Sequence, residues 1–274
     1  MHIQQVMDAI EHLAPRRLAE DWDNPGLLVG DPGEEVRGIV TCLDVSDAVI
    51  DFAVKNGANL IVAHHPLIFR AQKHIRTDLP LGHTLQKLLI HGIAVYAAHT
   101  NLDIAVGGVN DVLANAIGLR KLSAFVITSQ DENGHTESLG RIGTLPEPMR
   151  IADFAQHVRQ SLHADHIRYV NATPRHGGAS VMPRPVRRVA LCSGAGAEYL
   201  DRAHHLGADA YLTGDVRYHD AQHAMQLGIH LIDAGHFATE YPIAHALADY
   251  LTRELEGTVP IYEDNFSHDF FTTL

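Results

Sequence analysis

The chain has 274 residues, of which 46% are hydrophobic and 20% are charged, a composition typical of a globular protein with one large or two medium domains. Its formal net charge of −12 argues against general affinity for nucleic-acid phosphates. No apolar run approaches the roughly 20 residues that a membrane helix needs, and the start of the chain lacks the features of a signal peptide. We therefore expect a cytoplasmic protein.

The predicted elements begin with an amphipathic helix over residues 2–14, because apolar side chains recur there at helical spacing. A turn rich in glycine and proline follows at residues 24–26. Strand, helix, strand, helix and strand are then expected over residues 38–43, 46–57, 59–63, 82–91 and 93–98. Another helix is expected near residues 108–117. Consecutive βαβ units of this kind predict a mostly parallel sheet.

The same alternation recurs later in the chain. Strand, helix, strand, helix and strand are expected over residues 188–192, 196–206, 209–213, 217–227 and 229–234. An offset of 150 residues aligns Gly57 with Gly207, and one of 137 aligns His99 with His236. We interpret this pattern as a duplicated α/β unit. The alternative is that glycine and alanine recur by chance at the helix ends of any βαβ sequence.

The predicted fold class is therefore α/β, with two similar α/β domains that arise from an internal repeat. The N-terminal domain is expected over residues 1–124 and the C-terminal domain over residues 125–274, with residues 125–187 as a short intervening segment and linker. Within that segment, strands and a helix that join the second sheet are expected over residues 139–144, 151–162 and 167–170. Residues 173–187, rich in proline, glycine and arginine, predict a loop or linker.

Three of the predicted strands run directly into histidines. His64 and His65 follow the second strand, and Pro66 prevents that strand from continuing. His99 and His236 follow the last strand of each repeat. Because functional groups in open α/β sheets lie just beyond the carboxyl ends of the strands, the pattern predicts a metal site there. The alternative for the adjacent pair is one core histidine and one turn histidine.

Two of these clusters add a carboxylate four residues further on, Asp103 and Glu240. Imidazole and carboxylate are ligands that zinc, iron and manganese accept. Five or six such groups exceed the needs of one tetrahedral ion, whereas two divalent ions roughly 3.5 to 4 Å apart would use them all. We therefore expect two divalent metal ions per chain, in a dinuclear site between the two domains. The expected metal ligands are His64, His65, Asp103, His236 and Glu240.

Several roles stay open at this stage. His99 is a candidate ligand, orienting residue, proton carrier or hydrogen-bonded loop histidine, with residues 100–102 expected as a loop. Pro242 predicts a helix that starts near Glu240, so that Glu240 could be a plain charge at a helix N-terminus. Asp215 is interpreted first as a helix N-cap and second as a residue that faces the site. The glycines at 194 and 196 are best explained by tight packing between strand and helix.

At these motifs the chain resembles the NGG-interacting-factor-like family of dinuclear-metal proteins, whose bacterial members carry the name GTP cyclohydrolase 1 type 2 homolog. The matching motifs cover nearly the whole chain and are Asp21-Trp22-Asp23-Asn24-Pro25-Gly26-Leu27, Ala63-His64-His65-Pro66-Leu67, His99-Thr100-Asn101-Leu102-Asp103, Gly194-Ala195-Gly196, Thr213-Gly214-Asp215 and Gly235-His236 through Glu240. The resemblance places the family's ligands on the five residues named above. It also implies a toroidal homohexamer whose metal pairs face an internal cavity.

The functional hypothesis is a dinuclear-metal-dependent hydrolase in which His99 is the candidate proton carrier. If the GTP cyclohydrolase name holds, the substrate is a purine nucleotide that is attacked at C8 of the guanine ring, with release of formate. The alternative is a non-catalytic metal-binding or metal-delivery protein, or a ring-shaped scaffold. The expected partners are copies of the same chain and a nucleotide or other small molecule, with no nucleic acid and no membrane.

Overall fold

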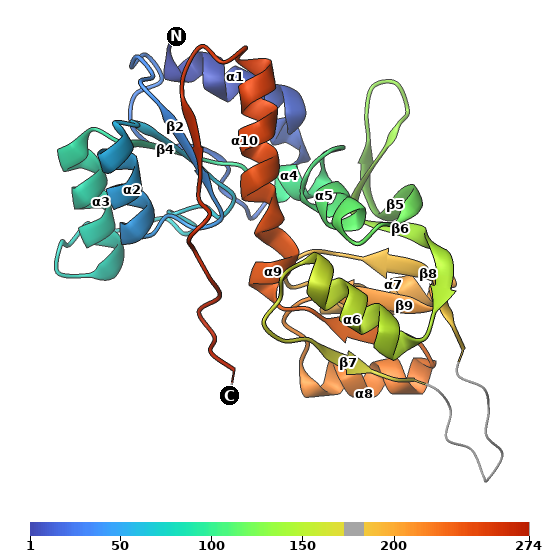
Figure 1. Cartoon of the computed structure of the whole chain (residues 1–274). Coiled ribbons are helices and arrows are strands. Elements are labelled where there is room, and N and C mark those ends of the chain that lie inside the picture. Colours follow the sequence, from blue (N-terminus) through green and yellow to red (C-terminus); the bar gives the residue numbers. More distant parts are fainter. Residues whose placement is uncertain (173–183, 274) are drawn as a thin grey trace. The chain divides into compact units, whose positions relative to one another are not determined.

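The computed structural model describes residues 1–172 and 184–273, which form two compact units (Figure 1). The first unit comprises Met1–Gly108 and Ile243–Ser267, and the second comprises Val109–Pro242 and His268–Leu274. The loop predicted over residues 173–187 lies mostly outside the described residues. Among the described residues, no helix has both the length and the apolar character to cross a lipid bilayer.

The first unit is built on a five-stranded sheet in the order β1-β4-β3-β2-β11. Its strands are β1 (Gly26–Val29), β2 (Ile39–Cys42), β3 (Leu60–Ala63), β4 (Ala94–Ala97) and β11 (Ile261–Glu263). Only the pairing of β1 with β4 is antiparallel in this sheet, so the prediction of a mostly parallel sheet is confirmed here. The parallel register joins Cys42 to Ala63 and Ala63 to Ala97, which brings the ends of these strands to one edge.

Four helices cover this sheet, two on each face: α1 (Ile3–Leu13), α2 (Asp47–Asn56), α3 (Pro80–His91) and α10 (Pro242–Glu254). Apolar residues of α2 and α3 pack with Val40, Ile61 and Val95 in one core cluster. Neighbouring strand residues point to the opposite face, where Thr41 donates a 2.7 Å hydrogen bond to a carbonyl of α10. The predicted caps of α2 are confirmed, with Ser46 at its start and Gly57 at its end.

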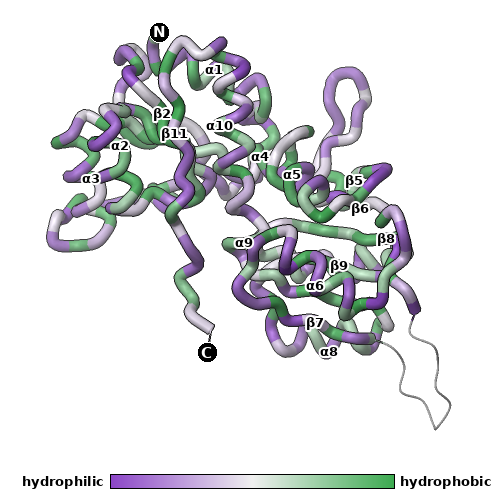
Figure 2. The backbone as a smooth tube through the Cα atoms, viewed as in Figure 1, coloured by the Kyte–Doolittle hydropathy of each residue, from purple (hydrophilic) through white to green (hydrophobic). Residues whose placement is uncertain are grey.

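The second unit contains a six-stranded sheet in the order β5-β6-β8-β9-β10-β7. Its strands are β5 (Arg120–Gln130), β6 (Thr136–Met149), β7 (Arg168–Val170), β8 (Val186–Leu191), β9 (Ala210–Thr213) and β10 (His230–Asp233). The three strands β8, β9 and β10 are parallel, and the remaining pairings are antiparallel, so this sheet is mixed and not mostly parallel as the sequence predicted. The strand β5 was not predicted, although it contains an apolar run over residues 124–127; most of its side chains are exposed. Figure 2 shows the hydrophilic tip of the β5–β6 hairpin.

Helices also cover both faces of the second sheet. They are α5 (Val109–Ala116), α6 (Ile151–Ser161), α7 (Leu200–His205) and α8 (Tyr218–Leu227). Apolar residues of α5 and α6, such as Leu113 and Phe154, share one core cluster with alternate strand residues. Residues of α7 and α8, such as Ala203 and Ala224, share the other. The short helices η1 (Arg16–Leu18), η2 (Ala197–Tyr199), α4 (Thr100–Ile104) and α9 (His236–Glu240) complete the elements.

The internal repeat is longer than the sequence pattern indicated. In chain order, α1-β1-β2-α2-β3-α3-β4-α4 corresponds to α6-β7-β8-α7-β9-α8-β10-α9. The strand orders β1-β4-β3-β2 and β7-β10-β9-β8 agree, and so do the pairing senses, antiparallel at the edge and parallel thereafter. The segment over residues 151–170, expected as an intervening segment, therefore supplies the first helix and the edge strand of the second repeat.

The helices after each repeat are exchanged between the units. The helix α5 follows the first repeat but packs in the second unit, and α10 follows the second repeat but packs in the first. The Tyr250 hydroxyl in α10 donates a 2.8 Å hydrogen bond to the Ala9 carbonyl of α1. Because β11 then pairs with β2, residues 243–267 complete the first sheet. The domains expected from the sequence, 1–124 and 125–274, are each continuous in the chain, whereas residues 243–267 belong to the first unit in the structure.

Candidate metal centre

Three imidazole rings meet at the carboxyl ends of β3 and β4. The ring centroids of His64 and His65 lie 5.1 Å apart, and that of His99 lies 5.2 Å from the first and 5.7 Å from the second. Each residue offers a ring nitrogen such that these atoms all lie within 4.8 Å of one another. The parallel register of the two strands produces this arrangement, since it ends them side by side. We call these three residues the histidine cluster.

Each ring of the histidine cluster is held through its Nδ1 atom. His64 Nδ1 lies 2.8 Å from the Ala98 carbonyl oxygen, and His65 Nδ1 lies 2.8 Å from Asp44 Oδ1. His99 Nδ1 lies 2.8 Å from Asp23 Oδ1. A carbonyl or carboxylate oxygen can only accept, so Nδ1 carries the proton in the neutral ring and Nε2 keeps its lone pair. Hydrogen bonds of this kind usually orient metal-binding histidines in proteins.

Asp103 is a buried carboxylate of the same unit. It lies in α4, and its Oδ1 atom is 3.7 Å from His64 Nε2. Residues 100–102 were expected as a loop but form part of this short helix, in which the backbone N–H of Asp103 donates to the His99 carbonyl. The helical turn brings Asp103 back towards the strand end, so that an imidazole and a carboxylate of the predicted ligand set face each other.

Asp23 connects the histidine cluster to the N-terminal segment. Its fully buried side chain accepts hydrogen bonds from His99 Nδ1, from the Thr100 backbone N–H at 3.0 Å and from the Thr100 hydroxyl. Burial alone raises the pKa of Asp23, but these hydrogen bonds and the nearby imidazole outweigh it and lower the pKa to about 2. The carboxylate therefore stays ionised and fixes the orientation of His99.

In the second unit, His236 and Glu240 form a pair on α9. His236 Nε2 lies 3.0 Å from Glu240 Oε2, and Glu240 is almost completely buried. The prediction of a helix that starts near Glu240 is confirmed, since α10 begins at Pro242. A second, short helix was not predicted: α9 begins at His236, where Gly235 adopts a φ of +83°, and Glu240 is its last residue.

Asp215 holds His236 as Asp23 holds His99. Its Oδ2 atom lies 2.9 Å from His236 Nδ1. The N-cap of α8 is Arg217, so the interpretation of Asp215 as that cap is wrong, and the second interpretation, in which it faces the predicted ligands, agrees with the structure. The His236 ring therefore has the same arrangement as the rings of the histidine cluster, with Nδ1 engaged by an acceptor.

Glycine is required beside Glu240. Gly194 has a φ of +58°, and a Cβ atom added there would lie 2.2 Å from Glu240 Oε1 and 3.3 Å from His236 Cε1. The backbone N–H of Gly194 also donates to the Thr239 hydroxyl at 3.0 Å. At Gly196, by contrast, an added Cβ would meet Cys192 and Thr213, as tight packing between strand and helix predicts. Gly194 thus makes room for a buried carboxylate, a role that the sequence analysis did not assign.

The donor set of these residues fits divalent metal ions. Imidazoles whose Nδ1 is engaged by an acceptor, so that Nε2 is the donor atom for a metal, and ionised carboxylates suit zinc, iron and manganese. The two aspartates that hold His65 and His99 were not predicted from the sequence. Asp44 could have been found by the same reasoning as the histidines, since it follows the end of β2, whereas Asp23 is brought to His99 only by the antiparallel pairing of β1 with β4.

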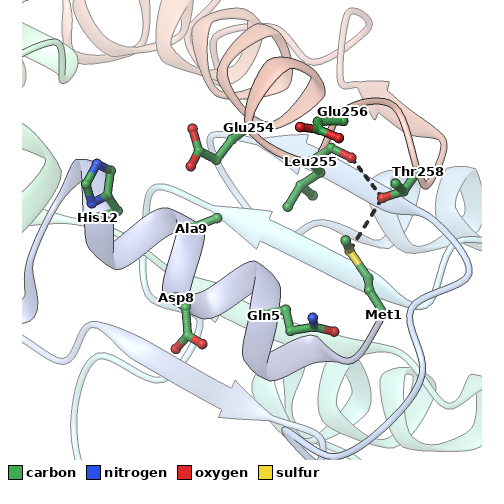
Figure 3. A pocket seen from close by; sticks show the side chains of 9 residues that line it. All are labelled: Met1, Gln5, Asp8, Ala9, His12, Glu254, Leu255, Glu256 and Thr258. Carbon is green, nitrogen blue, oxygen red and sulfur yellow. Dashed lines mark hydrogen bonds between the residues drawn. The ribbon is translucent and has the colours of Figure 1, made fainter.

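The first unit also contains an open pocket away from these residues. A cavity of about 480 Å³ in the first unit is lined by the N-terminus, α1 and the end of α10 (Figure 3). Its lining includes the carboxylates of Asp8, Glu254 and Glu256, and the Thr258 hydroxyl donates to the Leu255 carbonyl at its rim. None of the predicted ligands lines this cavity, so it does not belong to the candidate metal centre.

Comparisons with known proteins agree with the motifs. Residues 1–268 match the family Duf34/NIF3 (NGG1p interacting factor 3). A protein of Clostridium perfringens named GTP cyclohydrolase 1 type 2 homolog is 31% identical over 271 residues, which cover 99% of each chain. A protein of the same name from Streptomyces coelicolor is 34% identical, with 88% of this chain and 82% of that one covered. The crystal structure of a Bacillus cereus protein related to NIF3 superposes with a TM-score of 0.91 at 28% identity, over 100% and 99% of the chains.

Proposed function

Because the chain belongs to the Duf34/NIF3 family, we propose that it is a hydrolase that depends on two divalent metal ions. The proposed ligands are His64, His65, Asp103, His236 and Glu240. One observation carries the proposal: each of these histidines has its Nδ1 atom within 2.9 Å of a backbone carbonyl or carboxylate oxygen, which directs Nε2 to metal binding. Five ligands, two of them buried carboxylates, are more than one tetrahedral ion requires.

When bound, divalent cations would lower the pKa of water towards neutrality and polarise the bond to be cleaved. The chain's own residues would place the charges around them. Asp103 and Glu240 supply negative charge from buried positions, and Asp44 and Asp215 keep the proton on Nδ1 of the rings that they hold. These contacts fix both the charge and the direction of the donor atoms before any ligand arrives.

His99 is the proposed proton carrier. Its Nδ1 is bonded to the buried Asp23, so its Nε2 is the atom that would accept or deliver a proton. Its ring is also close enough to His64 and His65 to act as a further ligand. If His99 carries a proton and is not a ligand, His99→Gln should lower turnover and leave the number of bound metal ions unchanged. If His99 is a ligand, both turnover and the number of bound ions should fall.

The names of the relatives suggest the substrate class. Several relatives of about 30% identity carry the name GTP cyclohydrolase 1 type 2 homolog, and we propose that this chain also acts on a purine nucleotide. A first water would attack C8 of the guanine ring and open the ring to a formamide, and a second water would hydrolyse the formamide, which releases formate and leaves N–H groups on both former ring nitrogens. Formate release therefore gives a direct assay of this reaction.

The first experiment is to measure metal content per chain by plasma mass spectrometry in the wild type and in a His64→Ala/Glu240→Ala double variant. We expect about two ions per chain in the wild type and their loss in the variant. The exposed Glu254→Ala change is the matched control and should leave the metal content unaltered. Protein that takes up no divalent cations would refute the proposal. Metal-loaded protein that hydrolyses no nucleotide or ester would instead support the metal-binding or metal-delivery alternative.

We further propose that the chain self-associates as a homohexamer. The proposal derives from the resemblance to the family, one solved member of which superposes on this chain over its full length. Light scattering coupled to size-exclusion chromatography should give about six times the 30.0 kDa mass of the chain. A monomeric mass at micromolar concentration would contradict it.

A further inference from the structure

Two large aromatic side chains are exposed next to the histidine cluster. Trp22 is 59% exposed and Phe69 is 44% exposed. Their ring centroids lie 5.9 Å apart with an interplanar angle of 63°. Both rings also contact His99, at centroid distances of 6.1 Å and 6.3 Å. Exposed apolar surface of this kind, gathered at a candidate active site, usually marks a ligand-binding site.

Hydrogen bonds hold both aromatic residues in place from neighbouring positions. Asp23, which follows Trp22, is anchored by His99 and Thr100. The Asn24 side-chain amide donates a 2.6 Å hydrogen bond to the Ile68 carbonyl, directly before Phe69 in the chain. The two segments are thus tied to each other as well as to the histidine cluster. Segments that are held in place before a ligand arrives lose little conformational entropy on binding, which favours affinity.

We propose that Trp22 and Phe69 form a subsite that binds the planar heterocyclic ring of the substrate beside His99. This inference rests on the proposed function, because it places the ring next to the proposed metal ligands. Aromatic side chains bind planar rings by stacking, which is tolerant of the identity of the base. An organic cation would also be attracted by the aromatic rings, but divalent metal ions in the histidine cluster would repel it. A neutral or anionic heterocycle is therefore the favoured ligand.

The chain provides its own reporter for this subsite, since Trp22 is its single tryptophan. We would titrate metal-loaded and metal-free protein with GMP, AMP and UMP and follow the tryptophan fluorescence. Ribose 5-phosphate, which has the sugar and phosphate but no ring, is the control ligand. We expect saturable quenching by the nucleotides and none by ribose 5-phosphate.

Variants test whether nucleotide binding depends on these two aromatic rings or on the fold as a whole. Trp22→Ala and Phe69→Ala should each weaken nucleotide binding, measured by calorimetry, by about tenfold or more, the usual effect of losing one stacked aromatic ring. Trp22→Phe should retain part of the affinity. Phe271→Ala removes another exposed phenylalanine and should change nothing. All variants should keep the melting temperature and metal content of the wild type, which shows that the fold and the metal ligands are intact.

Two results would overturn the inference. One is the absence of quenching by all three nucleotides in protein that has bound its metal ions, which would leave the proposed metal-dependent function standing. The other is nucleotide binding that is equally tight in the wild type and in both alanine variants. If no metal binds, the proposed function fails instead, and quenching of the metal-free protein by nucleotides would still support an aromatic subsite.

Discussion

The carboxylate of Asp215 accepts a 2.9 Å hydrogen bond from His236 Nδ1, although the two residues follow different strands of the second sheet. Asp215 adopts a φ of +54°, in the left-handed region that residues other than glycine rarely occupy. A strained backbone conformation persists only when its surroundings enforce it, and such residues cluster at functional sites. The backbone at Asp215 is therefore arranged so that its side chain reaches the imidazole.

Replacing Asp215 with glycine removes the hydrogen bond to His236 without adding backbone strain, so a loss of metal affinity can be assigned to the lost hydrogen bond. Glycine adopts a positive φ without cost, so the Asp215→Gly variant should keep or exceed the thermal stability of the wild type. It should lose about 10- to 100-fold in metal affinity, the usual effect of removing a group that orients a metal-binding histidine. Affinity is measured by competition with a chelating dye. Asp220→Ala, which removes a partly buried carboxylate paired with the exposed Arg217, is the control, and equal affinities for both variants would contradict the assignment.

A pair of glycine substitutions tests the space beside Glu240. Gly194 and Gly207 both have positive φ, so alanine at either position strains the backbone by about 1 kcal/mol. No atom lies within 4 Å of a Cβ added at Gly207, whereas one added at Gly194 would collide with the carboxylate of Glu240. We expect Gly207→Ala to retain its metal and Gly194→Ala to lose it, as measured by plasma mass spectrometry. Full metal content in Gly194→Ala would argue against Glu240 as a ligand.

A buried ion pair should be essential to the second unit. Arg141 donates two hydrogen bonds to Asp111, of 2.7 and 2.9 Å, and both side chains are largely buried. Arg141→Met would leave Asp111 without this partner at the junction of α5 and β6, and should cost about 3 to 5 kcal/mol of unfolding free energy. Urea denaturation measures the change. The exposed pair of Arg150 and Asp153 is the control, and Arg150→Met should have little effect.

The stability of the second unit should depend on pH through His230. Burial lowers the pKa of this histidine below its ordinary value of 6.5, because it disfavours the charged ring. Its Nδ1 also accepts a hydrogen bond from the Ala172 backbone N–H, which a protonated ring could not do. The unfolded chain therefore takes up a proton more readily than the folded chain, so this contribution is full above about pH 6.5 and is lost as the pH falls.

The measurement compares urea midpoints at pH 7 and pH 5. The His230→Gln variant, whose side chain does not titrate, should lose less stability over this interval than the wild type does. His219→Gln, a change at an exposed position of α8, should behave as the wild type. A His230→Gln variant with the same pH dependence as the wild type would show that another group is responsible.

The sequence predicted most of the elements because their signals are local. The strands that end at His64, His99 and His236 are short apolar runs, and the caps of α2 are residues that favour helix ends. The parallel order of these strands then follows from the βαβ pattern, which is why imidazoles far apart in sequence could be expected at one edge of a sheet.

Other features depend on contacts that no local pattern reveals. Asp23 and His99 are 76 positions apart and meet because β1 pairs with β4. The edge strand β7 was predicted, but its antiparallel pairing with β10, which makes it the counterpart of β1, is a long-range contact, so the full extent of the second repeat was missed. The exchange of α5 and α10 is decided by packing, since both are ordinary amphipathic helices in sequence.

Because residues 243–267 return to the first unit, this unit can finish folding only after the second unit has been synthesised. The strands and helices of the second unit, over residues 109–242, are all synthesised before most of α10 and β11. The N-terminal unit, although it is made first, therefore lacks one of its covering helices and an edge strand until nearly the end of translation. A nascent chain stalled before residue 243 would expose the apolar sheet face that α10 covers and the edge of β2 that pairs with β11. Chaperones and proteases recognise incompletely folded chains of this kind.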